Sequence, residues 1–396
     1  MNQKQITTIA YYLAFILLGL TIAAEGPTLL KLAEHTSSQI DQISWIFFFS
    51  SLGYLTGSYI GGRLYDRVPG HQFMAGVLVM IGVFTIFVPI ITSRIALFVI
   101  VLVLGLAKGA LDVGCNTLLL WLHNEKVGPF MNGLHAAFGV GAFVSPLIVA
   151  GVLDATSEIH WAYWSFVIAA FPIAFFVWRL PSPQPRAISE QHKDAPVPVL
   201  PIIIMVTCFV LYVGAEAGYG NLIYTYAFKR GLATEITANY LTSAFWGFFT
   251  LGRLVAIWIS TRLKPISILL LDFAGCILSL GLILLFRDSQ TALWLGSILL
   301  GISLASIFPT FITLSEERMH ITGAITGWFL VGGGLGGMTL PVAMGYAFDN
   351  IGPSAMMMIV FVTVILDLLA LLIFIKTSTR AVTTGAKIPG EYEQGL

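Results

Sequence analysis

The sequence has few charged residues. Asp, Glu, Lys and Arg make up only 10% of the 396 residues, whereas a soluble domain carries about 25%. Lys and Arg together number 20, as do Asp and Glu, so no field of one sign favours nucleic acid or an acidic partner. Hydrophobic residues reach 57%. This composition excludes an ordinary soluble domain and predicts a multi-pass protein in a lipid bilayer.

Cysteine and catalytic motifs are scarce as well. The three cysteines all fall inside apolar runs, which favours buried inert thiols over a disulfide framework or a metal site. No Walker motif is present, so ATP is not expected to drive this protein. No nucleophile has a recognisable base partner, so we predict no catalytic residue, no enzyme activity and no cofactor apart from a coupling ion.

Long apolar runs are abundant and have the length of membrane spans. A run of about 20 residues crosses the hydrocarbon core, and runs this long and continuous predict helices rather than barrel strands. We expect an all-α fold of twelve transmembrane helices, near residues 6–30, 42–62, 71–92, 95–121, 130–153, 160–179, 200–227, 237–261, 265–286, 291–314, 324–347 and 353–375.

The loop charges predict the orientation. With both termini in the cytoplasm, the inner loops and tails hold 13 Lys and Arg residues and the outer loops hold 5, as the positive-inside rule favours. We therefore expect a plasma (bacterial inner) membrane protein with cytoplasmic termini. The Pro-rich segment "LPSPQPRAISEQHKDAPVPVLP" predicts six-helix bundles at 1–180 and 200–396, a cytoplasmic linker at 181–199, and a short cytoplasmic tail.

The two predicted bundles resemble each other in sequence. "SLGYLTGSYIGGRLYD" from Ser51 aligns with "TLGRLVAIWISTRLKP" from Thr250, and Gly53 then matches Gly252. Two six-helix repeats related about the membrane normal, with a substrate site between them at mid-depth, are typical of transporters that rock between two conformations.

A short motif carries a family resemblance. The stretch "GGRLYDR" contains Gly62, Asp66 and Arg67, and it resembles the G-x-x-x-D-R signature of the major facilitator superfamily. The usual glycine and two basic residues at its end are replaced here by "VPGH". The resemblance implies that Gly62, Asp66 and Arg67 belong to a cytoplasmic gate.

Two longer stretches narrow the resemblance. "LDVGCNTLLLWLHNEKVGPFMNGLHAAFGVGAFVSPLI" and "GAEAGYGNLIYTYAFKRG" look like the sodium-dependent glucose transporter-like branch, near the fucose permeases. This resemblance implies uptake of a hexose or similar polyol together with a proton or a sodium ion. It also implies that an acidic residue of the fourth helix takes part. We expect the protein to be a monomer whose partners are the lipid bilayer and a small-molecule substrate.

Three polar residues interrupt the fourth predicted helix. Lys108, Asp112 and Asn116 are spaced four apart, which stacks them on one helical face. Asp112 is our candidate ion-coupling residue, because carboxylates within a membrane are costly and usually functional. Lys108 is interpreted as a charge partner of Asp112, with contact to an anionic substrate as the alternative. Asn116 suits a sugar hydroxyl or an interhelical hydrogen bond.

Other candidate substrate-binding residues lie on the first helix of each half and on later helices of the second half. Glu25 and Glu216 stand beside glycines that favour a helix break, where transporters build sites. Glu216 is a candidate for both substrate binding and ion coupling, and Glu25 for substrate binding or the outer interface. The other substrate candidates are Asn221, Trp246 and Trp328.

A histidine and an arginine complete the set. His135 is a candidate proton relay, with simple packing as its alternative. Arg253 lies within a span and should pair with a carboxylate, Glu216 or Asp272.

The leading hypothesis is therefore ion-coupled symport of a hexose or polyol by rocker-switch alternating access. The charges of Lys108, Arg253, Glu25 and Glu216 also suit a transporter of zwitterions or organic acids, which is the second hypothesis. The methionine run in "AMMMIV" gives weak support to a third, an exporter of apolar compounds. A nutrient sensor is disfavoured by the short tail.

Overall fold

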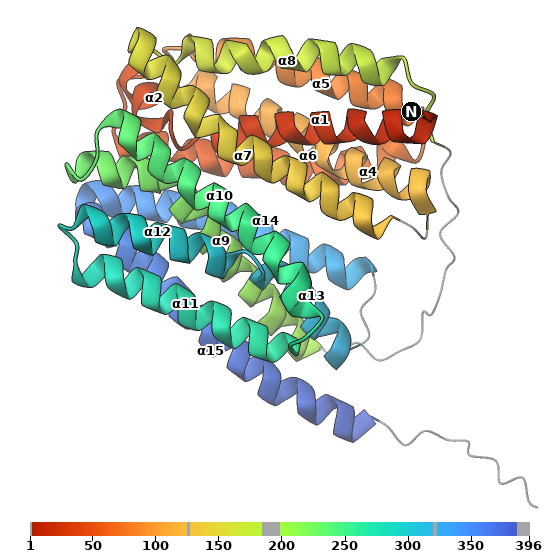
Figure 1. Cartoon of the computed structure of the whole chain (residues 1–396), viewed down its shortest axis with the longest axis vertical. Helices are drawn as coiled ribbons and strands as arrows, with labels where there is room; N and C mark the ends of the chain where they lie inside the picture. The colour runs from red at the N-terminus through yellow and green to blue at the C-terminus, as the bar shows by residue number, and fades with distance from the viewer. Residues whose placement is uncertain (1, 125–126, 184–198, 320–322, 386–396) are drawn as a thin grey trace, which may run out of the picture.

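The computed structural model describes residues 2–124, 127–183, 199–319 and 323–385, and these form fifteen α-helices (Figure 1). The first eight are α1 (Gln3–Ala23), α2 (Leu29–His35), α3 (Ile40–Ile43), α4 (Trp45–Tyr65), α5 (Gly70–Phe87), α6 (Arg94–His123), α7 (Gly128–Thr156) and α8 (His160–Trp178). The rest are α9 (Val199–Lys229), α10 (Glu235–Ser260), α11 (Pro265–Leu285), α12 (Gln290–Leu304), α13 (Ile307–Arg318), α14 (Gly323–Asn350) and α15 (Pro353–Gly385).

The long helices have the dimensions of membrane spans. Within the described ranges, eleven are long and apolar enough to cross a bilayer, with α12 and α13 counted together. The helix missing from that set is α4, which has 21 residues but includes several Gly, Ser and Tyr residues. The predicted all-α membrane fold is confirmed. The helix α4 lies at the span predicted near 42–62, which completes the twelve predicted spans.

The helices form two bundles with matching internal packing. In Figure 1, α1, α4, α5, α6, α7 and α8 lie above α9 to α15. The helix pairs α1–α7, α4–α6 and α5–α8 of the first bundle correspond to α9–α14, α10–α12 and α11–α15 of the second. The bundles meet where α7 packs on α10 and α4 on α14, so the interface repeats the same symmetry. The predicted linker at 181–199 lies mostly outside the described residues.

Glycines allow α4 and α6 to approach closely. A Cβ added at Gly53 or Gly57 would collide with the backbone of α6 at Leu102 or Leu106. One added at Gly109 would collide with the backbone of α4 at Tyr54. Small residues stabilise helix pairs in membranes because they let the backbones pack directly together. The polar side chains between these glycines are therefore held in fixed register.

Two predicted spans are broken. The first was predicted to run through residue 30, but α1 ends at Ala23 and a turn leads to α2. The span predicted at 291–314 is divided between α12 and α13, with Ala305 and Ser306 between them. Hydrophobicity does not reveal either break, because the apolar pattern continues across both.

Hydrogen bonds between the bundles are found at one end and near mid-depth. We call the end with Gln3 and Ser182 the linker end and the opposite one, with α2 and α3, the far end. At the far end, the backbone N–H of Asp41 donates to Asp349 Oδ2 at 2.7 Å. Near mid-depth, the Ser243 hydroxyl donates to the carbonyl of Phe143 at 2.9 Å. These contacts join the halves from the far end to the middle of the molecule.

Candidate functional site

The carboxylate of Asp112 is held by two polar side chains. Tyr54 Oη of α4 donates to Asp112 Oδ2 at 2.5 Å. Asn116 Nδ2, one turn along α6, donates to Asp112 Oδ1 at 2.9 Å. Each oxygen therefore has a neutral donor, while all three side chains stay partly exposed. The predicted association of Asp112 with Asn116 is present, and Tyr54 joins it.

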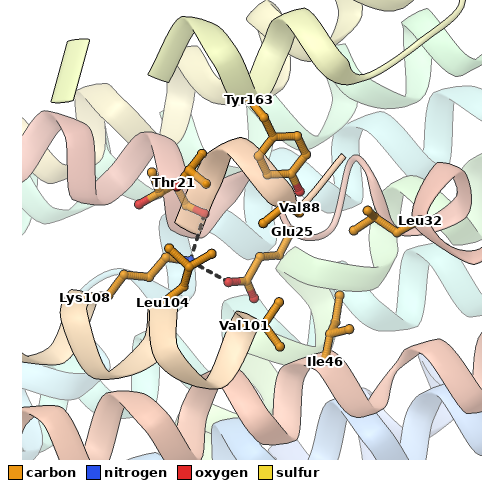
Figure 2. A pocket seen from close by; sticks show the side chains of 10 residues that line it. Thr21, Glu25, Leu32, Ile46, Val88, Val101, Leu104, Lys108 and Tyr163 are labelled. Atoms are coloured by element: carbon orange, nitrogen blue, oxygen red, sulfur yellow. Dashed lines mark hydrogen bonds and ion pairs between the residues drawn. The ribbon is translucent and has the colours of Figure 1, made fainter. Parts of the chain in front are cut away.

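Lys108 pairs with Glu25, which makes the predicted Lys108–Asp112 pair wrong. Lys108 Nζ lies 2.6 Å from Glu25 Oε1, and the two side chains are 3% and 13% exposed. Figure 2 shows Lys108 extending from α6 toward Glu25 and the Thr21 carbonyl, which it meets at 3.1 Å. The four-residue spacing brings Lys108 and Asp112 to one side of α6, but each side chain turns to a different neighbouring helix.

The break after α1 provides this second partner. Because α1 ends at Ala23, Glu25 lies in the turn that follows, and its N–H bonds to Ile22 O rather than Thr21 O. The Thr21 carbonyl is therefore available to Lys108. Ser50 of α4 donates to the same Glu25 oxygen at 2.9 Å. The ion pair adjoins a small cavity whose remaining lining includes Leu32, Ile46, Thr85, Val88, Val101, Leu104 and Tyr163 (Figure 2).

These contacts change the interpretation of Glu25 and Lys108. Both side chains are engaged inside the first bundle, and Lys108 is buried. A substrate between the bundles would meet them only after the ion pair opened. The structure therefore places Glu25 outside the set of freely available substrate contacts.

Arg253 of α10 forms no ion pair with the described residues, so its predicted salt bridge is wrong. Its guanidinium carbon lies 4.5 Å from the ring centroid of Phe249, one turn earlier on the same helix. Asp272, one proposed partner, instead accepts a 2.5 Å hydrogen bond from Ser306. The buried Nε of Arg253 has no hydrogen-bond partner within the described chain. The guanidinium therefore stacks on Phe249 instead of forming an ion pair within 4 Å with a described carboxylate.

Glu216 and His135 lie near Arg253 and come from different bundles. The charge of Arg253 acts on Glu216 of α9 and on His135 of α7. His135 continues the α7 face on which Gly139 meets Thr250 of α10. His135 is exposed and lies 5.9 Å, ring to ring, from Phe15 of α1. The structure thus brings two predicted ion-coupling residues toward one cation at the interface.

Unlike Glu25, Glu216 lies within a continuous helix. The residues around it, including its flanking glycines, belong to α9 without interruption. The predicted break is therefore present beside Glu25 and absent beside Glu216.

The remaining substrate candidates have different surroundings. Asn221 of α9 is partly exposed, and its backbone lies against Gly26 of the first bundle. Trp246 is buried over Gly220, with its ring centroid 5.5 Å from that of Phe249. Asn221 therefore lies at the interface, whereas Trp246 packs mainly within its own bundle.

Trp328 stands apart from these residues. It is 60% exposed and shares a stripe of α14 with Leu335 and Tyr346, which are 43% and 60% exposed. Tyr346 lies toward the far end, where the bundles touch, so this stripe faces away from the interface. The structure does not bring Trp328 together with the other candidates.

The predicted gate residues lie at the linker end of α4. Gly62 is near the end of α4, where an added Cβ would touch only Val113 at 3.6 Å. Asp66 and Arg67 follow at the helix end, and both are exposed. Neither side chain forms an ion pair with the described residues. Their exposure agrees with bundles that touch at the opposite end, and their predicted role in a gate stays a prediction.

Tyr54 and Ser50 were missed by the sequence analysis. They lie four residues apart on α4 and face Asp112 and Glu25, respectively. Their spacing, continued by Ser58, is the signal that could have identified a polar face on α4. That face and the Lys108–Asp112–Asn116 face come together because α4 packs along α6.

The site offers hydrogen-bonding groups and charges. No group of three or more His, Cys, Asp or Glu side chains suited to a metal was found among the described residues. Asp112, Asn116, Tyr54 and Glu216 offer donors and acceptors, and Arg253 offers a cation that has no ion-pair partner among the described residues. Such a set can bind a small polar solute and exchange protons without a covalent step.

Comparison with known proteins identifies the family. The profile of the Major Facilitator Superfamily matches residues 11–341. The chain is 32% identical to Sodium-dependent glucose transporter 1 of Xenopus laevis, over 83% of this chain and 73% of that protein. It is 29% identical to Sodium-dependent glucose transporter 1A of Mus musculus, over 84% of this chain and 88% of that protein.

A solved structure has the same fold. The crystal structure of the nucleoside transporter NupG matches with a TM-score of 0.72 and 14% sequence identity, covering 95% of this chain and 99% of that one. At this identity the likeness concerns the fold alone. The resemblance drawn from the "GGRLYDR" motif and the two longer stretches is confirmed: this chain is a membrane transporter of the major facilitator superfamily, related to the sodium-dependent glucose transporter 1 proteins.

Proposed function

We propose that this protein is a symporter that moves a hexose or a similar polyol together with a cation. The observation that carries the proposal is the sequence relationship, over most of the chain, to proteins named as glucose transporters. The polar residues at the bundle interface have the chemistry that this substrate class needs. Sugar hydroxyls both donate and accept hydrogen bonds, and amide and carboxylate side chains complement them.

The substrate contacts in this proposal come from both bundles. Asp112, Asn116 and Tyr54 contribute from the first bundle, and Glu216, Asn221 and Arg253 from the second. Trp246 is near enough to Phe249 and α9 to shape the apolar part of the same site. A substrate held by both halves would stabilise the states in which they close around it.

The coupling cation is a proton or a sodium ion, with Asp112 and Glu216 as its carriers. Asp112 is bonded to Tyr54 of α4, and Glu216 is near Arg253 of α10; α4 and α10 both pack on the opposite bundle. His135 offers an exchangeable proton beside Arg253. A bound cation neutralises the carboxylate. The free-energy cost of enclosing the carboxylate in a closed site away from water therefore falls. This link between charge and closure is the physical basis of symport here.

We further propose that the protein acts as a monomer in the plasma (bacterial inner) membrane, with both termini in the cytoplasm. The linker end then faces the cytoplasm, in agreement with the distribution of Lys and Arg. In this orientation the contacts at Asp41 and Asp349 close the outer side. The structure then represents an inward-facing state, and exposed Asp66 and Arg67 belong to an open cytoplasmic gate.

A second candidate substrate class is an organic acid or zwitterion, and one observation favours it. Arg253 has no carboxylate oxygen within ion-pair distance in the described chain, so an anionic substrate could supply one. Lys108 no longer supports this alternative, because Glu25 already neutralises it.

Uptake into proteoliposomes tests the proposal. Radiolabelled glucose, fucose and inositol are supplied under separate proton and sodium gradients, with empty liposomes as the control. We expect saturable uptake of at least one of these compounds, inhibited by other hexoses and unaffected by nucleosides or amino acids. Uptake of none of them, with folded protein and competition only by carboxylates or amino acids, would select the second candidate.

A further inference from the structure

We propose that the ammonium group of Lys108 is a resident cation that occupies a position suited to a sodium ion, so that this chain binds no Na⁺ at the break after α1. The proposal concerns the interior of the first bundle and holds whatever the transported substrate is. It bears directly on coupling, because the relatives of this chain are named for sodium dependence.

The atoms around Lys108 Nζ are of the kinds that hold Na⁺. The Thr21 carbonyl lies at 3.1 Å and Glu25 Oε1 at 2.6 Å. The Ser50 hydroxyl bonds to that same Glu25 oxygen and lies at the edge of the group. Freed carbonyls at a helix break, together with a carboxylate, coordinate Na⁺ in transporters that have discontinuous helices.

The break itself explains why these oxygens point inward. The Thr21 carbonyl has lost its bond to the N–H of residue 25, because that N–H turns to Ile22 O. Such a carbonyl needs another donor or a cation. Lys108 supplies both from α6, because the ammonium group is a donor and a positive charge.

The charge balance leaves no place for a second cation. One carboxylate and one ammonium group neutralise each other, and the Lys108 side chain is only 3% exposed. The adjoining cavity is lined mainly by apolar side chains such as Leu104, Val101 and Val88, and its further polar side chains, Thr85 and Tyr163, carry hydroxyls without a charge. A sodium ion would therefore meet Lys108 rather than a free carboxylate.

Removing the ammonium group should uncover the sodium site. Lys108→Ala leaves the Glu25 carboxylate, the Thr21 carbonyl and the Ser50 hydroxyl around an emptied space. Lys108→Ala with Glu25→Gln removes the negative charge as well and is the matched control.

The test is thermal unfolding of the purified full-length protein in detergent, in NaCl or in choline chloride at equal ionic strength. We expect wild type and Glu25→Gln to show the same difference between the two salts, because neither binds Na⁺ at this break. Lys108→Ala should gain several degrees in NaCl, in a saturable way, because a ligand that binds only the folded state stabilises it. The double variant should lose that gain.

Two results would overturn the proposal. One is saturable stabilisation of wild type by Na⁺ that Glu25→Gln removes. The other is a folded Lys108→Ala protein that shows no response to Na⁺. If Lys108→Ala does not fold, equilibrium binding of radioactive sodium to wild type decides: Glu25-dependent binding overturns the proposal, and absence of such binding supports it. No sugar is present, so failure of sugar transport would leave this result unaffected.

Discussion

The carboxylate of Asp112 accepts a hydrogen bond of 2.5 Å from Tyr54. Lys108, one turn earlier on α6, forms its ion pair with Glu25 at 2.6 Å and not with Asp112. The first bundle thus holds the carboxylates of Glu25 and Asp112 in different ways. Glu25 is neutralised by a buried cation, whereas Asp112 has only neutral donors. An acid without a fixed cation can change its charge during a transport cycle, which makes Asp112 the better carrier of the coupling ion.

Replacing Asp112 by Asn should separate coupling from substrate movement. Asn keeps the size of the side chain and its bond with Tyr54, but it cannot carry a proton or a cation. We expect gradient-driven accumulation of substrate to be lost, while exchange of internal for external substrate is retained. Counterflow and accumulation, measured in the same proteoliposomes, check this. Equal loss of both would show that Asp112 binds substrate or holds the helix instead.

Tyr54→Phe is the companion variant for that experiment. It removes one donor to Asp112 and leaves the carboxylate in place. We expect accumulation to fall only several-fold. A loss as complete as that of Asp112→Asn would mean that Tyr54 itself is required.

The Lys108–Glu25 pair should be costly to break from one side. Lys108→Met leaves a buried carboxylate uncompensated, and Glu25→Gln leaves a buried ammonium group; each should cost roughly 3–5 kcal/mol of unfolding free energy. The double variant should be more stable than either single one, because no charge is left unpaired. Unfolding of all four proteins in choline chloride measures this coupling. Strictly additive losses would contradict the ion pair.

The close packing of α4 against α6 should not tolerate a larger residue. Gly109→Ala would push its Cβ into the backbone at Tyr54 and Ser58, which should cost about 1–3 kcal/mol of unfolding free energy. It should also reduce transport, because Tyr54 and Asp112 move apart. Gly76→Ala on α5 is the control, since nothing lies within 4 Å of its added Cβ. Equal melting temperatures for both variants would contradict this prediction.

The contact between Asp41 and Asp349 should help to keep the far end closed. Asp349→Ala removes the acceptor for the Asp41 N–H and should shift the population toward the state that is open at the far end. Labelling of a cysteine placed at Ser51, which lies beside α14 near mid-depth, should become a few-fold faster from that side. Asp288→Ala, which removes the exposed Arg230–Asp288 pair within the second bundle, should change nothing. Unchanged labelling in Asp349→Ala would count against a role in closure.

The general architecture could be predicted from the sequence, because helices are the only structures that fit these long apolar runs. The partners of individual polar residues could not. Periodicity correctly placed Lys108 and Asp112 on one face of α6, but the break after Ala23 decided which acid Lys108 meets. Arg253 illustrates the same limit: a cation within a membrane span needs stabilisation, and the ring of Phe249 lies against it where an ion pair with a carboxylate is predicted. Trp328 is a substrate candidate only because it lies near the middle of its predicted span. That position does not tell which side of the helix faces the partner bundle.

The most direct test of the central claim is accumulation of radiolabelled hexose by the wild-type protein in sealed proteoliposomes. Under an imposed proton gradient we expect the internal concentration to exceed the external one and to fall to equality when an uncoupler is added. If sodium is the ion carried at Asp112 and Glu216, a sodium gradient of the same size should drive the accumulation in place of the proton gradient. Hexose that only equilibrates under either gradient, or that never enters, would contradict ion-coupled sugar symport.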